Sequence, residues 1–319
     1  MPFFFRAPFR LLCAVLSAWF CIGCAATSPA LQRFEYIDFV MAARARVVVY
    51  AHDEGEARQA GHAAIKRMHE LEAVMSDYRE TSELARLMAA SVGQPFAISD
   101  DLFRVLAQSQ QLAELSGGAF DATIGPLSLL WRQARRDGKL PSDDELAEAR
   151  GRVGWRLLTL DEATQTATLH AAGIRLDLGG IGKGFAVDEA MRELRRRGYA
   201  HVLVSLAGDI AVGEPPPNRD AWVVAIGTGT HERMLQLRNQ AASTSGDLEQ
   251  FVELGGLRYS HILDPRTGLG LVRHVAVTVL APDATTADSL ATALNVLGPD
   301  AAADLLGHFP GAKAFFLHE

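Results

Sequence analysis

Cysteine is absent from the sequence after residue 24. The chain of 319 residues has three cysteines, and Cys13, Cys21 and Cys24 all lie near the N-terminus. The rest of the chain therefore has no disulfide, no cysteine-based metal site and no cysteine nucleophile. A chain of this size buries enough apolar surface to fold without disulfides.

Positive charge is also scarce. The chain has 31 lysine and arginine residues against 38 aspartate and glutamate residues, which gives a formal net charge of −7. The densest basic run, residues 195–197, closes an expected helix, where cations interact favourably with the helix dipole. The lack of a basic stripe argues against nucleic acid as a partner.

The N-terminus has an apolar run that is too short to cross a bilayer comfortably. Arg6 and Arg10 come before an apolar core of about a dozen residues that ends at Gly23, which is typical of a signal peptide. Gly23 followed by Cys24 resembles a bacterial lipoprotein cleavage site, with Cys24 as the lipidated first residue. The alternative is ordinary signal cleavage near residues 25–27.

Either cleavage predicts an exported protein on the periplasmic side of a bacterial cell, with Cys24 as its anchor to a membrane in the first case. We expect a signal peptide over residues 1–23, a tether over 24–38 and one domain over 39–319. Strands and helices mix in that domain without a regular βαβ repeat, which predicts an α+β fold. The clearest expected helices are residues 54–74, 100–115, 124–134 and 284–294, and the clearest strands are 44–51, 201–206, 222–226 and 275–280.

A glycine-rich turn is the most informative stretch of the domain. Residues 176–188 read Leu-Asp-Leu-Gly-Gly-Ile-Gly-Lys-Gly-Phe-Ala-Val-Asp, between an expected strand at 174–178 and an expected helix at 186–197. The free N–H groups at a helix start attract an anion such as phosphate, and Lys183 adds a cation there. The spacing fits neither a P-loop nor a dinucleotide-binding fingerprint. A tight turn without a ligand is the alternative.

Six segments of the chain carry distinctive motifs. They are Met75–Leu84 with Met-Ser-Asp-Tyr-Arg and Ser-Glu-Leu, Gly118–Leu127 with Gly-Ala-Phe-Asp, the turn at Asp177–Gly184, Thr244–Asp247, His261–Gly268 with His-Ile-Leu-Asp-Pro-Arg-Thr-Gly, and Ala287–Ala293 with Ala-Asp-Ser-Leu-Ala-Thr-Ala. In this order they resemble segments of the ApbE family, the FAD:protein FMN transferases. The resemblance implies two packed α+β lobes with the flavin site between them. It also implies transfer of the FMN moiety of FAD to a Thr or Ser hydroxyl of an acceptor flavoprotein subunit, with Mg²⁺ and release of AMP.

The resemblance also implies a set of site residues. Those expected to contact FAD are Met41, Tyr78, Ala119, Phe120, Asp121, Asp177, Lys183 and His261. The metal is expected on Asp288, Thr292 and the backbone carbonyl of Gly182. Lys183, His261 and Asp288 are the expected catalytic residues, with His261 as the candidate base for the acceptor hydroxyl.

Each of these residues has an ordinary structural alternative. Asp288 and Thr292 are four apart on an expected helix, so they share a face, and carboxylate and hydroxyl oxygens suit Mg²⁺. Without a metal, Asp288 would face solvent and Thr292 would bond to the helix backbone. Lys183 could be a surface lysine, and Tyr78 and Phe120 could be core aromatics.

Two alternative functions use the same residues. A Mg²⁺-dependent FAD pyrophosphatase would transfer FMN to water, and a flavin-binding lipoprotein would hold FAD without turnover.

Overall fold

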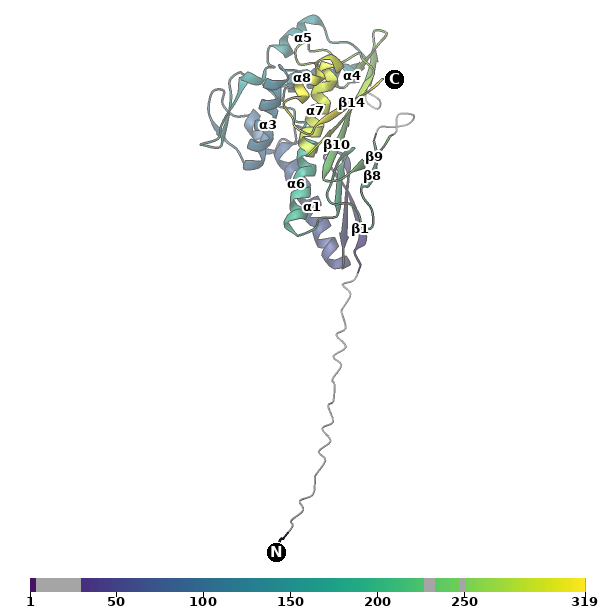
Figure 1. Ribbon diagram of the computed structural model, residues 1–319. Helices are drawn as coiled ribbons and strands as arrows, with labels where there is room; N and C mark the ends of the chain where they lie inside the picture. The colour runs from purple at the N-terminus through teal and green to yellow at the C-terminus, as the bar shows by residue number, and fades with distance from the viewer. Residues whose placement is uncertain (4–29, 227–232, 247–250, 319) are drawn as a thin grey trace. The chain divides into compact units, whose positions relative to one another are not determined.

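A seven-stranded antiparallel sheet forms the centre of the fold (Figure 1). The computed structural model describes residues 1–3, 30–226, 233–246 and 251–318, and Leu31–Glu319 belong to one structural unit. In order across the sheet, the strands are β1 (Gln32–Val40), β2 (Ala43–Ala51), β6 (Val202–Leu206), β7 (Asp209–Val212), β10 (Gln240–Ser245), β13 (Val275–Ala281) and β14 (Lys313–His318).

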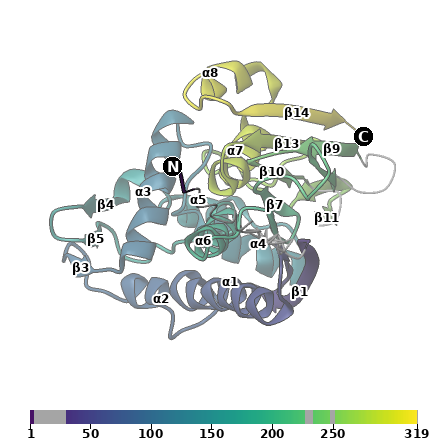
Figure 2. The same cartoon turned by 60° about the horizontal axis from the view of Figure 1, so that its bottom comes forward.

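Three helices cover one face of this sheet. Figure 2 shows α1 (Glu54–Met75), α6 (Gly182–Arg196) and α7 (Ala284–Leu297) side by side along it. Successive side chains of a strand point to opposite faces, so Val47 and Val49 of β2 pack with the apolar side of α1 in the main core. The helices thereby bury the face of the sheet from which β7 and β10 contribute polar side chains to the candidate site.

A two-stranded hairpin covers part of the other face. It consists of β8 (Trp222–Ile226) and β9 (Arg233–Leu237), which pair with each other in antiparallel fashion. Val48, which lies between two helix-facing valines of β2, packs with Trp222 in a second apolar cluster. Strand β2 is therefore apolar on both faces.

The remaining elements surround this core. Among the residues that the structure describes, they are α2 (Glu83–Met88), β3 (Phe96–Ala97), α3 (Asp100–Leu115), α4 (Gly125–Asp137), α5 (Asp143–Arg150), β4 (Leu158–Asp161), β5 (Thr166–Leu169), β11 (Phe251–Leu254), β12 (Leu257–Ser260), α8 (Ala302–Leu306) and the single-turn 3₁₀ helices Trp155–Leu157 and Pro299–Ala301. The strands β3, β5 and β4 form a small sheet. This mixture of elements confirms the α+β prediction.

Several boundaries differ from the predicted ones. Residues 174–178 are not a strand, because the segment makes only one isolated bridge, from Arg175 to Ile124. Helix α6 begins at Gly182 rather than at residue 186, so Lys183 lies in its first turn. Strand β1 pairs with β2 along its whole length from Gln32 onward.

Other predictions about organisation stay predictions. The single unit from Leu31 does not confirm a division into two lobes. Cys24 and residues 4–23 of the predicted signal peptide lie outside the described residues. Within the described part of the chain, no helix is both long and apolar enough to cross a membrane.

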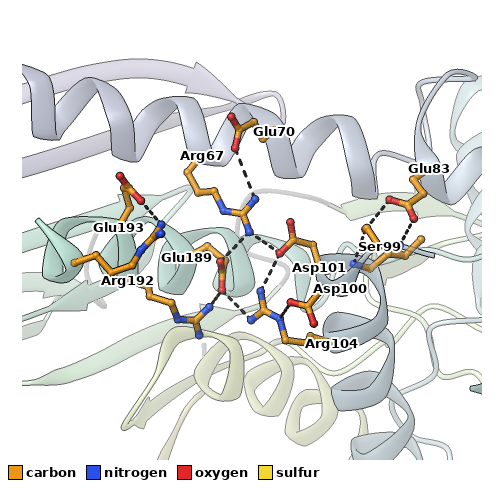
Figure 3. Close-up of polar contacts among 12 residues, drawn as sticks. Arg67, Glu70, Glu83, Ser99, Asp100, Asp101, Arg104, Glu189, Arg192 and Glu193 are labelled. Carbon is orange, nitrogen blue, oxygen red and sulfur yellow. Dashed lines mark hydrogen bonds and ion pairs between the residues drawn. The ribbon is translucent and has the colours of Figure 1, made fainter. Parts of the chain in front are cut away.

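A network of ion pairs holds α6 against α1 and α3 on the outside of the three-helix layer. Glu189 of α6, only 5% exposed, accepts hydrogen bonds from Arg67 of α1 at 2.8 Å and from Arg104 of α3 at 2.9 Å (Figure 3). Arg192 of α6 also donates to Glu189, and both Arg67 and Arg104 contact Asp101. These contacts fix the helix that carries Lys183.

Candidate functional site

The glycine-rich turn and the first turn of α6 lie against α7. Gly184 is required by close packing, because a Cβ there would lie 2.3 Å from the carbonyl oxygen of Ala284. A Cβ on Gly180 would lie 3.1 Å from the hydroxyl of Thr292 and 3.2 Å from the ring of Phe120. The turn therefore needs these two glycines for a close approach, which brings the backbone of α6 beside the side chains of α7.

Two buried carboxylates and one ammonium group meet at this approach. The Nζ of Lys183 donates to Oδ2 of Asp209 at 2.9 Å and lies 3.3 and 3.4 Å from the two carboxylate oxygens of Asp288. Asp209 is 2% exposed and Asp288 is 3% exposed, whereas the side chain of Lys183 is 30% exposed. We call Lys183, Asp209 and Asp288 the charged trio. Lys183 is thus no ordinary surface lysine, and Asp288 does not face solvent.

The charged trio shifts the pKa values of its members. Burial raises the pKa of Asp288, and the charge of Asp209 raises it further. Lys183 and the Gly184 N–H group, which donates to Asp288 at 3.0 Å, lower this pKa, but their effect is smaller. Burial alone would lower the pKa of Lys183, but the two carboxylates more than reverse this and hold it above its ordinary value. Lys183 is therefore an ammonium ion at any physiological pH.

The residues expected to hold Mg²⁺ fit a hard divalent cation. Asp288 and Thr292 lie on one helix, α7, and both face the glycine-rich turn in which Gly182 opens α6. Their oxygens are the donors that Mg²⁺ prefers. Among the described residues, no group of three or more His, Cys, Asp and Glu side chains could hold a metal by itself. A metal at this place would therefore depend on neutral oxygens, from Thr292 or the backbone, and on the phosphates of a substrate.

Helix α7 is fixed at its N-terminus by a residue of α6. Asp188 accepts hydrogen bonds from the backbone N–H groups of Ala284 and Thr285, both at 2.8 Å. Burial outweighs the effect of these hydrogen bonds and raises the pKa of Asp188 to about 6. Asp188 was not predicted as a site residue, although it closes the glycine-rich stretch.

A second cluster lies around Arg132 of α4. Arg132 contacts Asp77 at 2.9 Å and Asp177 at 3.4 Å, and its guanidinium lies 4.5 Å from the ring centre of Tyr78. Tyr78 is 75% exposed, so its ring is not a core aromatic and can stack against a planar ligand. Burial, followed by the charge of Asp177, raises the pKa of Asp77. Sequence reasoning missed Arg132, which follows the Gly118–Leu127 segment on helix α4.

The predicted residues of the Gly-Ala-Phe-Asp segment are buried. Ala119 and Phe120 belong to apolar clusters, and Asp121 accepts hydrogen bonds from the N–H and the hydroxyl of Thr123, both at 2.7 Å. Burial raises the pKa of Asp121. The ring of Phe120 packs beside Gly180, so this segment contacts the glycine-rich turn.

Met41 and His261 lie on other elements. Met41 and Ala42 form the tight β1–β2 turn, with φ angles of 52° and 57°, in the left-handed region that favours glycine. His261 follows β12 and is exposed. The roles of Met41 and His261, like those of the other expected site residues, stay predictions.

Comparisons with known proteins agree on one family. The sequence model of the ApbE family matches residues 41–316. A Haemophilus influenzae protein named FAD:protein FMN transferase is 36% identical over 75% of this chain and 72% of its own length, and a Treponema pallidum protein of the same name is 33% identical over 93% and 87%. The apo crystal structure of the flavinyl transferase ApbE from Pseudomonas stutzeri superimposes with a TM-score of 0.80 at 29% identity, covering 91% of this chain and 92% of that one.

Proposed function

This chain belongs to the ApbE family and has its FAD:protein FMN transferase activity, and we propose that it moves the FMN moiety of FAD onto a Thr or Ser hydroxyl of a partner protein, with Mg²⁺, releasing AMP. The charged trio is the observation that carries the proposal. A permanently protonated lysine lies beside a buried aspartate at a helix start, which suits a pyrophosphate with its metal.

The two clusters match two parts of the proposed substrate, its flavin ring and its pyrophosphate. Tyr78 is exposed and offers a flat ring to the flavin, while Lys183, in the first turn of α6, offers positive charge to the phosphates. Arg132 orders Tyr78 from one side and is itself neutralised by Asp77 and Asp177. FAD would therefore lie with its ring near α4 and its pyrophosphate near α6 and α7.

The proposed reaction is a substitution at phosphorus. The acceptor oxygen forms a bond to the phosphorus of the FMN moiety, the bond from that phosphorus to the bridging oxygen breaks, and AMP leaves with that oxygen. The acceptor hydroxyl gives up its proton, for which His261 is the proposed base, because it is exposed where a partner protein could reach it. Lys183 offsets the negative charge of the phosphate oxygens.

Asp288, Thr292 and the Gly182 carbonyl would hold the Mg²⁺. When bound, the ion would neutralise pyrophosphate charge and favour the departure of AMP. The chain itself supplies the arrangement: the Gly184 N–H and Lys183 orient Asp288, and the close approach at Gly180 orients Thr292. The site therefore combines positioning with charge neutralisation.

We also propose that the protein is exported and anchored to a membrane through Cys24. The Gly23–Cys24 pair after a short apolar run supports this. A Cys24→Ala protein should be released in soluble form or remain an unprocessed precursor. A processed Cys24→Ala protein that stays on the membrane would contradict the anchor.

One incubation distinguishes the proposed activity from its alternatives. The purified protein is mixed with FAD, Mg²⁺ and a candidate acceptor, and the products are separated. Covalent flavin on the acceptor with an equal amount of AMP supports the transferase. Free FMN with AMP, in the presence of a folded acceptor, would identify a pyrophosphatase, and intact FAD would identify a binding protein.

A further inference from the structure

No step of the proposed reaction assigns a role to Asp209, yet it is tied to the site by two hydrogen bonds. It begins β7 directly after a turn in which Ala207 and Gly208 both have positive φ angles. Its Oδ2 accepts from Lys183, and its Oδ1 accepts from the hydroxyl of Ser243 on the neighbouring strand β10. Both carboxylate oxygens are therefore engaged, and the sheet fixes the side chain that holds Lys183.

The distances show how the lysine is shared. Lys183 lies 2.9 Å from Asp209 but 3.3 and 3.4 Å from the oxygens of Asp288, so Asp209 is its nearer partner. Two carboxylates and one ammonium give the charged trio a net charge of −1. A buried net charge is unfavourable unless it is compensated, so the trio favours one more cation.

The position of that cation follows from the same contacts. Asp209 already uses both oxygens, whereas Asp288 receives one backbone N–H group and only the longer contacts of Lys183. If Asp209 carried no charge, Lys183 would neutralise Asp288 completely, and the site would lose its attraction for a metal. If the lysine merely formed a buried salt bridge, the two aspartates would have equivalent roles, and loss of either charge would have the same effect on metal binding.

We propose that Asp209 is a positioning residue for flavin transfer: it retains the Lys183 ammonium, so that Asp288 keeps a negative charge for a divalent cation. Lys183 and the cation thus compete for Asp288. By pairing with Lys183, Asp209 leaves Asp288 available to the cation. This inference rests on the proposed function only in naming Mg²⁺ as the cation.

Two isosteric substitutions should change Mg²⁺ affinity in opposite directions. Asp209→Asn raises the net charge of the trio from −1 to 0 and should weaken Mg²⁺ binding by about tenfold or more. Lys183→Met lowers it to −2 and should strengthen Mg²⁺ binding by about tenfold or more. Both single variants should transfer flavin more slowly than the wild type, because each disturbs the lysine that contacts phosphate.

Calorimetric titration of MgCl₂ into the full chain at pH 8, with saturating ADP to supply a pyrophosphate but no flavin, measures these affinities once the binding of Mg²⁺ to ADP alone, titrated in parallel, is accounted for. The double variant should return to within about threefold of the wild type, since its trio again has a net charge of −1. Ser243→Ala is the matched control: it removes the other hydrogen bond of Asp209 without changing any charge, and should leave Mg²⁺ affinity within about threefold.

The outcomes separate this inference from the proposed function. Affinity changes of the same sign in the two single variants, no change in either, or no Mg²⁺ binding by the wild type would overturn the role of Asp209 even if the wild type flavinylates its acceptor. Opposite changes in a protein that leaves every tested acceptor unmodified would support the role of Asp209 and count against the transferase activity.

Discussion

The carboxylate of Asp188 on α6 accepts hydrogen bonds from both the backbone N–H and the hydroxyl of Thr285 on α7. Asp188 therefore caps a helix to which it does not belong. The same two helices carry Lys183 and Asp288, so this contact fixes the spacing on which the charged trio depends. Helix α7 also has a cap of its own, Asp283, whose side chain accepts from the N–H of Thr286 at 2.7 Å.

Asp188→Ala should lower both stability and Mg²⁺ affinity. It leaves buried N–H groups at the start of α7 without their acceptor, which should reduce the free energy of unfolding by about 2–3 kcal/mol. Asp283→Ala removes only the local cap and should cost about 1 kcal/mol with unchanged Mg²⁺ affinity. Urea unfolding and MgCl₂ titration of both variants test the difference. Equal effects on Mg²⁺ affinity would mean that Asp188 is merely a second cap.

Gly184→Ala should destabilise the protein, because the new methyl group would overlap the carbonyl of Ala284 at the closest approach of α6 and α7. We expect a loss of about 2–3 kcal/mol in unfolding free energy, despite the better helix propensity of alanine.

The matched substitution Gly180→Ala places its methyl group at longer distances from Thr292 and Phe120, so it should lower the unfolding free energy by less than about 1 kcal/mol. Because it displaces Thr292, it should slow flavin transfer by about tenfold. The reverse order of stabilities would refute the packing account.

Glu189→Gln should be among the most destabilising single substitutions outside the apolar core. It leaves three arginine side chains around a buried neutral amide, and breaking a buried ion pair on one side costs about 3–5 kcal/mol. Glu193→Gln on the same helix loses pairs with the exposed Arg196 and Arg197 and should cost about 1 kcal/mol or less. Thermal and urea unfolding of the two variants provide the comparison.

Mg²⁺ affinity should fall as the pH is lowered through the raised pKa of Asp288, about 6. Burial and Asp209 raise this pKa above the ordinary value of 3.8, and only the deprotonated carboxylate binds the ion. Below pH 6 the affinity should therefore fall by about tenfold for each pH unit. Titrations between pH 5 and pH 8 measure this slope. A midpoint near pH 4 would show that the buried trio does not raise the pKa.

The spacing of apolar residues predicted most helices and strands, because each element buries one face and its apolar residues therefore recur at the helix or strand period. Helix α3 spans the predicted residues 100–115, and β8 spans 222–226. Strand β1 was missed because Ile37 and Phe39 lie on its exposed face among charged residues, which breaks the alternation of apolar and polar side chains. Its pairing with β2 is seen only in the structure. The expected strand at 174–178 fails because the segment is extended but has no continuous partner.

Site residues that belong to a sequence motif could be predicted. Site residues that matter only through a contact between distant parts of the chain could not. Lys183, Asp288 and Thr292 come from two distant motifs, and the structure brings them together. Asp209 and Arg132 carry no signal of their own in the sequence, because their importance comes from the charges opposite them. Buried charge pairs of this kind are set by packing, which periodicity does not encode.

Mass spectrometry of an acceptor protein incubated with FAD and this protein tests the central claim most directly. The account predicts that the acceptor gains the mass of one FMN on a Thr or Ser side chain with the wild type and Mg²⁺. It predicts no gain when a chelator removes the metal, and none with Asp288→Ala, which should still fold. Unchanged modification by the wild type under chelation, or by Asp288→Ala with Mg²⁺, would contradict the assignment of the metal and of the reaction to this site.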